Sequence, residues 1–549
     1  MLLHKQQKIL FSRLPSFLEL LKLHTPLKEK AIKINVWRNH GFETLVPLMQ
    51  PYLATRNISI DFQISSYDDS FSFAEYSHAS IEILWLDPKV LLSQSSSGRW
   101  VNWLSERINF LRRLSKSPII LATWAESGID VKKITEVVDS VRYTFFADLS
   151  ELCCEYSINL KDSRNMSFAA SAISRFAQVI IARKLACHWI SALLLPPIKA
   201  IAIDLDITLH KGILGEDEIS GVLLTDEHRA LHHKIKKIQK QGIFIALISR
   251  NEYSDVKKLF SIRKEYPLRL EDFTEIEISW DEKSNAIKRI AESINISTDA
   301  IIFVDDNPGE LFEVNKNLPH THIILAHADA SITERVIDYY PGLWRWNYSE
   351  DDYKRVNDFK ANKDRNLFLS KSQDLNKYYS SLEIKLKIYL EPFLYLDRLS
   401  DLSNKTNQFN LALKRYSEID LFNFLNSKDT EVFGIGLNDK LSDSGIISLL
   451  VAELIDHDLM IHEVCISCRA LGRKLEDAII FTAIKNMRIF KECKKVIFSI
   501  KYGKRNKPAI SWIEKHSNEI NAYAHDVHII DAENIRNYSL PKGLKIIKT

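Results

Sequence analysis

The chain has 549 residues, of which 46% are hydrophobic and 26% charged, and its formal net charge is +3 at pH 7. This composition is typical of a globular protein of two to four domains, and the near-neutral charge argues against nucleic acid or an anionic membrane as the main partner. The six cysteines are too few for a disulfide framework in a chain of this length. We therefore expect reduced thiols and a cytoplasmic protein.

The N-terminal residues MLLHKQQKILFSRLPSFLELLK mix charged and apolar residues. They lack the continuous apolar core and small-residue cleavage site of a secretion signal. No run of 18 apolar residues occurs in the chain, so we expect no membrane partner.

Residues 1–195 alternate short apolar runs with polar or amphipathic segments. The runs of strand length are IKINVW, ISIDFQI, IEILWL and PIILATW. Between the first two, GFETLVPLMQPYL has apolar residues at helical spacing. This alternation predicts a parallel sheet flanked by helices.

Residues 196–345 repeat this pattern more clearly, and two further segments follow them. The five predicted strands of 196–345 are AIAIDLD, GIFIALIS, FTEIEIS, AIIFVDD and THIILA, and HRALHHKIKKIQKQ and DEKSNAIKRIAESI are predicted helices. The charged residues 346–384 predict a helical connector. Residues 385–549 begin with LEIKLKIYL and continue with VFGIGL, GIISLLVAELI, LMIHEVCIS and KKVIFSI, with helices after CRALGRK and from about Pro508. The chain is thus predicted to be an α/β protein of three domains, each with a mainly parallel or mixed sheet flanked by helices.

Polar side chains follow four strands of the middle domain. They are Asp204 and Asp206 after the first strand, Ser249, Arg250 and Asn251 after the second, Lys283 beyond the third, and Asp305 and Asp306 at the end of the fourth. Ligand sites in open α/β sheets lie at the carboxyl ends of the strands. Asp, Asn and Ser are common in turns, which would explain any one of these residues. Four strand ends with such residues favour a single functional crevice.

Three carboxylates and a lysine in one crevice suit a magnesium ion, because Mg²⁺ prefers oxygen ligands that it shares with substrate phosphates. One aspartate can attack phosphorus as a nucleophile, and the next but one can protonate the leaving group and later activate water. A hydroxyl and a lysine can hold the phosphoryl oxygens. The pattern therefore indicates phosphoryl-transfer chemistry.

These motifs resemble those of the haloacid dehalogenase (HAD) superfamily, whose DxDxT motif corresponds to DLDIT here. The resemblance implies that Asp204 is the nucleophile and Asp206 the general acid/base. It implies a phosphate-binding role for Thr208, Ser249, Arg250, Asn251 and Lys283. It also implies Mg²⁺ as the cofactor, with Asp204, Asp206, Asp305 and Asp306 as the metal-site residues.

Longer segments are similar to FkbH-like proteins of this superfamily. DLDITLHKGILGED, ISRNE, IIFVDDNPGE, NKTNQFNLALKRY and ISCRALGRKLEDA follow the family's segments in the same order over about residues 197–545. Family members of this type use 1,3-bisphosphoglycerate, remove phosphate and pass the glyceryl group to the phosphopantetheine thiol of an acyl carrier protein. Others are assigned only as HAD phosphatases in surface-polysaccharide or secondary-metabolite pathways.

Three residues depart from the family's motifs. His210 and Lys211 stand where Trp-Gly is usual, and Arg250 replaces a lysine. We expect all three residues, His210, Lys211 and Arg250, to lie in substrate-facing loops and set the choice of donor. Ile248 stands where some members have a cysteine, so a thioester tether is not expected there.

The C-terminal domain resembles GNAT-type acyltransferases. RALGRK at 469–474 is a partial match to their phosphate-binding loop, and NKPAISWIEK resembles a later helix. The resemblance implies that Arg469, Gly472, Arg473 and Asn506 contact a pantetheine arm or acyl group. The alternative is a folded domain with a basic surface loop. For NKTNQFNL, a binding surface and an interdomain contact remain equal alternatives.

The N-terminal domain, residues 1–195, resembles the SGNH-hydrolase-like or flavodoxin-like domain of longer family members. It lacks a Gly-Asp-Ser nucleophile segment, and no Asp-x-x-His pair occurs between about 140 and 196. We interpret His40, in the loop after the first strand, as a surface or packing residue. This domain is therefore expected to be non-hydrolytic.

The combined expectation is a Mg²⁺-dependent enzyme that dephosphorylates a small phosphorylated acyl donor and loads the acyl group onto a carrier thiol. The first alternative is a phosphatase fused to a CoA-dependent N- or O-acyltransferase. The second is a non-catalytic interaction protein, against which the complete set of Asp204, Asp206, Lys283 and Asp305 argues.

Overall fold

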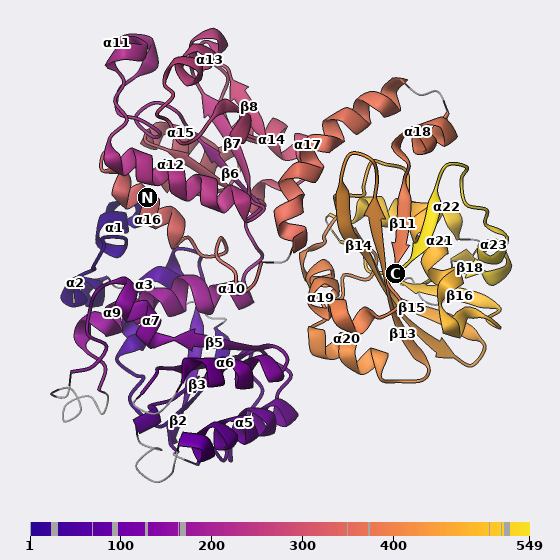
Figure 1. Ribbon diagram of the computed structural model, residues 1–549, viewed down its shortest axis with the longest axis horizontal. Coiled ribbons are helices and arrows are strands. Elements are labelled where there is room, and N and C mark those ends of the chain that lie inside the picture. The colour runs from indigo at the N-terminus through magenta and orange to yellow at the C-terminus, as the bar shows by residue number, and fades with distance from the viewer. Residues whose placement is uncertain are drawn as a thin grey trace. The chain divides into compact units, whose positions relative to one another are not determined.

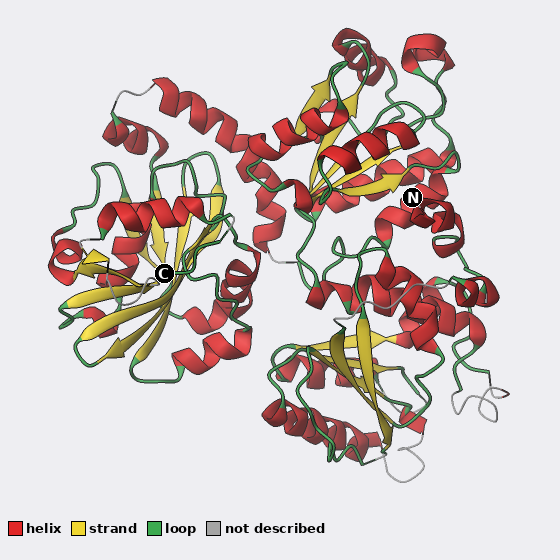
Figure 2. Cartoon of the chain, turned by 180° about the vertical axis from the view of Figure 1, so that it is seen from behind, coloured by secondary structure: helices red, strands yellow, loops and turns green. Residues whose placement is uncertain are grey.

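The computed structural model describes the chain except for residues 1, 24–30, 69, 90–96, 127–129, 163, 165–171, 349, 372–373, 504, 518 and 521–526. Two compact units are present. The first comprises 1–236, 246–287 and 298–347, and the second comprises 237–245, 288–297 and 348–549. The boundary passes through one strand and two helices of residues 196–345. Figure 1 labels the elements, and Figure 2 shows the strands of the three sheets.

A five-stranded parallel sheet forms the N-terminal part of the first unit, in the order β2-β1-β3-β4-β5. Its strands are β1 (Ile32–Arg38), β2 (Ile60–Tyr67), β3 (Ile81–Trp85), β4 (Ile119–Thr123) and β5 (Thr144–Asp148). The central strands are buried completely because helices cover both faces. The helices here include α1 (Leu2–Leu10), α2 (Phe17–Lys22), α3 (Leu45–Ala54), α5 (Ser97–Leu114), α6 (Val131–Ser140), α7 (Leu149–Glu155) and α9 (Arg175–Lys184).

The helical stretch Arg175–Leu194 has the length and apolar composition of a membrane span. It consists of α9, the π-helical turn η2 (Leu185–Trp189) and α10 (Ser191–Leu194). Its most apolar window is 78% buried inside the structure. The stretch therefore serves as a core helix of this unit in the described structure.

The second five-stranded sheet has the order β10-β9-β6-β7-β8. Its strands are β6 (Ala200–Ile203), β7 (Phe244–Ser249), β8 (Glu275–Ile278), β9 (Ile301–Asp305) and β10 (His322–Leu325). The helices are α11 (Leu214–Gly221), α12 (Asp226–Lys240), α13 (Tyr253–Ile262), α14 (Lys283–Ser293), α15 (Pro308–Asn317) and α16 (Ala330–Asp338). Since β6 lies between β9 and β7, its carboxyl end is where the strand order reverses, the usual ligand position in such sheets.

The third sheet has nine strands and mixed directions, in the order β17-β18-β16-β15-β14-β13-β11-β19, with β12 paired to β15. The strands are β11 (Lys385–Ile388), β12 (Phe409–Asn410), β13 (Thr430–Asn438), β14 (Asp443–Ile455), β15 (Asp458–Ile466), β16 (Lys495–Ser499), β17 (Glu519–Ile520), β18 (Val527–Asp531) and β19 (Lys545–Lys548). The helices include α18 (Leu375–Leu382), α19 (Leu396–Lys405), α20 (Glu418–Leu425), α21 (Glu476–Asn486), α22 (Lys507–His516) and α23 (Ala532–Asn537). The predicted fold class is confirmed, with two parallel sheets and one mixed sheet.

The long helix α17 (Glu350–Lys371) is joined to the mixed sheet by a buried network of charged groups. Arg365 donates to Asp439 at 2.7 Å and to Asp358 at 3.1 Å. Arg473 lies 3.2 Å from both aspartates, and all four side chains are at most 3% exposed. Two cations and two anions satisfy one another here, so α17 is held by directional contacts as well as by apolar packing.

Replacing Arg365 by alanine should destabilise the second unit by about 3 to 5 kcal/mol, because two buried carboxylates lose a partner. Urea unfolding followed by circular dichroism measures this loss. Lys377→Ala, at an exposed position on α18, is the control and should change the free energy of unfolding by less than about 0.5 kcal/mol. Equal effects of the two substitutions would contradict the role assigned to the network.

Candidate active site

Three carboxylates meet at the carboxyl ends of β6 and β9. One oxygen from each of Asp204, Asp305 and Asp306 lies within 4.8 Å of the others. Asp204 directly follows β6, and Asp305 is the last residue of β9. Because β6 and β9 are paired in parallel, their ends place these residues side by side.

Lys283 connects two of these carboxylates. It is the first residue of α14, and only 4% of its side chain is exposed. Its ammonium group contacts Asp204 Oδ1 and lies 3.4 Å from Asp305 Oδ2. The predicted residues Asp204, Lys283 and Asp305 are thus brought together by the fold.

The carboxylates perturb one another in this buried setting. Burial is the main cause that raises the pKa of Asp204 to about 8, and the Asp305 charge adds to it while Lys283 opposes it. Burial and the Asp305 charge raise the pKa of Asp306 to about 6. Burial also raises the pKa of Asp305. Lys283 therefore does not fully balance the negative charges of these three carboxylates.

The residues present fit a divalent cation. Asp305 Oδ2 is buried and, apart from its ion-pair contact with Lys283 at 3.4 Å, accepts no hydrogen bond from the described residues. All ligand atoms in the cluster are the hard oxygens that Mg²⁺ prefers. The structure thereby supports the predicted magnesium site, with Asp204, Asp305 and Asp306 as the residues that would hold the ion. The fourth predicted metal residue, Asp206, is not part of this cluster.

Asp206 is instead held by three donors. Its Oδ1 accepts from His210 Nε2 at 3.2 Å and from the Leu214 backbone N–H at 3.0 Å, and its Oδ2 accepts from Asn251 Nδ2 at 2.7 Å. Burial alone would raise the pKa of Asp206, but these hydrogen bonds outweigh it and lower the pKa. The carboxylate is therefore oriented by the protein and separate from the metal cluster.

The predicted phosphate-binding residues lie in two environments. Thr208 and Ser249 are buried hydroxyls, and the Thr208 hydroxyl has no hydrogen-bond partner among the described residues. Asn251 also donates to Ser249 Oγ at 2.9 Å. Arg250 is 41% exposed and pairs with Glu310 at 3.0 Å, so its side chain is directed to another carboxylate.

The two predicted donor-specificity residues of the first loop, His210 and Lys211, differ in exposure. Lys211 is exposed and its backbone forms an antiparallel bridge with Leu223. His210 is completely buried and contacts Asp206. The expectation of a substrate-facing His210 therefore needs correction, because the loop turns this ring inward.

Glu310 is a residue of the site that the sequence analysis did not single out. It lies in the first turn of α15, and burial raises its pKa, opposed by Arg250 and Lys283. The segment IIFVDDNPGE contains Glu310. The motif that indicated Asp305 could therefore also have indicated Glu310.

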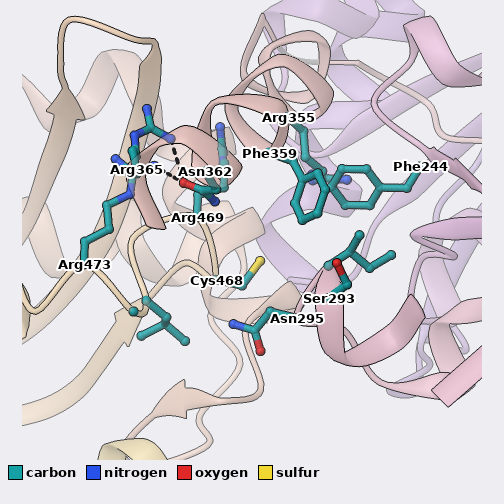
Figure 3. Close-up of a pocket in the computed structure, with 13 residues that line it drawn as sticks. Phe244, Ser293, Asn295, Arg355, Phe359, Asn362, Arg365, Cys468, Arg469 and Arg473 are labelled. Atoms are coloured by element: carbon teal, nitrogen blue, oxygen red, sulfur yellow. Dashed lines mark hydrogen bonds between the residues drawn. The ribbon is translucent and has the colours of Figure 1, made fainter. Parts of the chain in front are cut away.

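A second candidate site is a cavity of about 200 Å³ whose lining residues all belong to the second unit. Four arginines, Arg355, Arg365, Arg469 and Arg473, line it together with Cys468 (Figure 3). The predicted residues Arg469, Gly472 and Arg473 are thus present, with both arginine side chains already bound to protein groups. The buried Arg473 Nε has no hydrogen-bond partner among the described residues.

The predicted contact residue Asn506 does not line this cavity. It is completely buried, and its amide donates to Asn410 O and Lys501 O at 2.9 Å while its oxygen accepts from Gly503 N–H. All its hydrogen-bonding groups serve the fold. The expectation that Asn506 contacts a pantetheine arm is therefore corrected.

Asn410 belongs to the NKTNQFNL segment, which inserts beside β15. Strand β15 pairs with β16 only over Leu459–Ile461, and beyond that β12 pairs with β15. Leu411 then bridges Val464 and Lys501 through backbone hydrogen bonds of 3.1 and 2.9 Å. The chain itself occupies the opening between these two strands.

The carboxylate of Glu463 fixes this insertion by accepting from the backbone N–H groups of Ala412 and Lys414 at 3.0 and 2.7 Å. Burial raises the pKa of Glu463 to about 7.

His40, in the N-terminal sheet, is a packing residue as interpreted. It is 2% exposed, stacks on Trp85 at 5.1 Å and contacts the edge of Trp124 at 5.5 Å. Burial, followed by the charge of Arg38, lowers its pKa to about 3. It is therefore neutral at physiological pH.

No protein-family model matches the chain, and no curated protein matches it significantly. Among solved structures, the N-terminal part of the protein BF1531 from Bacteroides fragilis, containing a phosphatase domain complexed with Mg, is 20% identical, with a TM-score of 0.46, over 61% of this chain and 99% of that chain. A HAD family enzyme from Bacteroides thetaiotaomicron, complexed with magnesium and inorganic phosphate, is 13% identical, with a TM-score of 0.18, over 24% of this chain and 95% of that chain.

The PaiA N-acetyltransferase from Thermoplasma acidophilum, in complex with coenzyme A, is 13% identical, with a TM-score of 0.22, over 27% of this chain and 98% of that chain. All three TM-scores lie below 0.5, so we draw no functional conclusion from these similarities.

Magnesium should bind more tightly as the pH rises from 6 to 8.5. The pKa values of Asp204 and Asp306 are raised to about 8 and about 6, and a carboxylate must lose its proton before it binds the metal. Isothermal titration with MgCl₂ at several pH values measures this trend. A pH-independent affinity, or unchanged binding in Asp305→Asn, would contradict the assigned cluster.

Proposed function

We propose that the chain is a Mg²⁺-dependent HAD-type phosphatase and phosphotransfer enzyme that acts through a phospho-aspartate at Asp204. The observation that carries this proposal is the buried contact of Lys283 with Asp204 beside Asp305 and Asp306. A lysine that close to a carboxylate offers a cationic position for phosphoryl oxygens next to the attacking oxygen. The free cysteines support a cytoplasmic setting.

In the first step, a carboxylate oxygen of Asp204 attacks phosphorus, and the bond from phosphorus to the leaving oxygen breaks. Asp206 donates a proton to that oxygen, and in the second step it takes a proton from the water that hydrolyses the phospho-aspartate. A bound Mg²⁺ would offset the repulsion between carboxylates and phosphate. Thr208 and Ser249 supply hydroxyl donors for the phosphoryl oxygens.

For the donor, we propose a small phosphorylated acyl compound such as 1,3-bisphosphoglycerate. Asp204 removes the 3-phosphate of this donor by the two steps above. The thiolate then attacks the carbonyl carbon, the acyl phosphate leaves with the electron pair of the broken C–O bond, and a glyceryl thioester forms. The acceptor is the phosphopantetheine thiol of an acyl carrier protein. This part rests on the family resemblance and on the arginine-lined cavity, which suits an anionic phosphate group.

The alternative acceptor chemistry is a CoA-dependent N- or O-acyltransferase in the C-terminal domain. The insertion of β12 does not distinguish the two acceptors, because coenzyme A and a carrier protein present the same pantetheine arm. An extended arm can pair with a strand edge only where that edge is free, and the edge of β15 beyond Ile461 pairs with β12.

The proposal predicts phosphate release from 1,3-bisphosphoglycerate in the presence of Mg²⁺, with a glyceryl mass gain on a holo carrier protein in intact mass spectrometry. Asp204→Asn should lower release of the 3-phosphate by at least about 10³-fold, because the nucleophile is lost. Lys257→Ala, at an exposed position on α13, serves as the matched control and should retain full activity.

Two other results would change the proposal. Phosphate release without a mass gain on the carrier would leave a phosphatase and reject the carrier as acceptor. Saturable binding of acetyl-CoA, measured by calorimetry, would favour the acyltransferase alternative.

A further inference from the structure

The ring of His210 contacts the carboxylate that the proposed function uses as general acid/base. Its Nε2 lies 3.2 Å from Asp206 Oδ1, and the side chain is completely buried. We propose that His210 is a positioning residue that, together with the Leu214 N–H, fixes Oδ1 and leaves Oδ2 to exchange the proton with the substrate. This inference rests on the proposed function of Asp206.

The contact defines the tautomer of the ring. An ionised carboxylate can only accept, so His210 Nε2 must carry the proton that it donates to Asp206. The other ring nitrogen, Nδ1, is buried and has no hydrogen-bond partner among the described residues. Among the described residues, the hydrogen bond of the ring is therefore the one that Nε2 donates to Asp206.

The two oxygens of Asp206 differ in their surroundings. Oδ1 accepts two hydrogen bonds, from His210 and from Leu214, whereas Oδ2 accepts one from Asn251. Asn251 also donates to Ser249 Oγ, a predicted phosphate-binding hydroxyl. Oδ2 is thus the oxygen on the side of the phosphate site, with a lone pair left for a proton.

The loop that delivers His210 is closed on itself. Ile207 and Gly212 have φ values of +59° and +106°, and the Ile207 N–H donates to Gly212 O at 3.2 Å. From α12, His232 Nε2 donates to Leu209 O at 2.8 Å. The loop backbone is therefore held at both sides of His210, which aims the ring at Asp206.

Gly212 is needed for this turn. A Cβ at this position would lie 2.8 Å from Asp217 Oδ2, and the positive φ disfavours other residues. Asp217 also accepts from the Ile213 N–H at 2.8 Å. The start of α11 and the His210 loop thus form one local structure around Asp206.

The test compares His210→Phe, which keeps a ring and removes the donor, with His210→Gln, whose amide can replace Nε2–H. With p-nitrophenyl phosphate and Mg²⁺, the Phe variant should lose about 10- to 100-fold in kcat with KM within about 3-fold, as for other residues that orient a reacting group. The Gln variant should stay within about 3-fold of wild type in both constants. His228→Gln, at a nearby buried histidine bonded to Thr225, is the control and should retain wild-type kcat.

A second readout does not depend on turnover. Amide hydrogen exchange followed by mass spectrometry should show faster exchange at the Leu214 N–H in His210→Phe, confined to peptides covering residues 207–216, and normal exchange in His210→Gln. Unchanged exchange in the Phe variant would overturn the inference even if no phosphatase activity is found. An equal loss of kcat in the Phe and Gln variants would overturn it as well, whereas absence of Asp204-dependent turnover in wild type rejects the proposed function separately.

Discussion

The site depends on one buried ammonium group, that of Lys283, placed between Asp204 and Asp305. Burial by itself would lower the pKa of Lys283, but the two carboxylates outweigh this effect and raise it, so the lysine is charged. Removing such a charge from water is costly unless it is paired. The pairing in turn requires that β6 and β9 be neighbours and that α14 begin at Lys283. The geometry of the site therefore depends on the strand order of the sheet.

Much of this arrangement could be predicted from the sequence. The apolar runs that end in Asp204 and Asp305 have strand length, and parallel strands present their carboxyl ends at one edge. The N-terminal sheet was harder, because β5 (TFFAD) is only half buried and lacks a clear apolar run. Very short strands such as β12 and β17 are defined by their partners, since two residues carry no periodicity of their own.

The inward turn of His210 could not be predicted for a related reason. A histidine in a polar loop is ordinarily exposed, and only the closed loop with positive φ at Ile207 and Gly212 directs it to Asp206. The same holds for Asn506, for which the resemblance of NKPAISWIEK to a GNAT helix implied a ligand contact. In both cases the side chain serves a local hydrogen-bond network that spacing along the chain does not reveal.

In the C-terminal domain, two segments that carry the sequence resemblance make contacts within the protein that leave less surface open. The loop at 469–474 lies against α17, where Arg473 takes part in the buried ionic network, and Arg469 donates to Ser444 O. Residues 409–414 meanwhile occupy the opening beside β15. The second unit thus has an arginine-lined cavity beside this network, and its own chain fills the space between β15 and β16.

The central claim is that Asp204 accepts a phosphoryl group beside a bound cation. Beryllium trifluoride, which mimics a phosphoryl group on an aspartate, tests this directly when ¹⁹F NMR is recorded with and without Mg²⁺. The account predicts protein-bound fluoride resonances that require Mg²⁺ and disappear in Asp204→Asn. Bound resonances that persist in the Asp204→Asn variant, or none in the wild-type protein at saturating Mg²⁺, would contradict it.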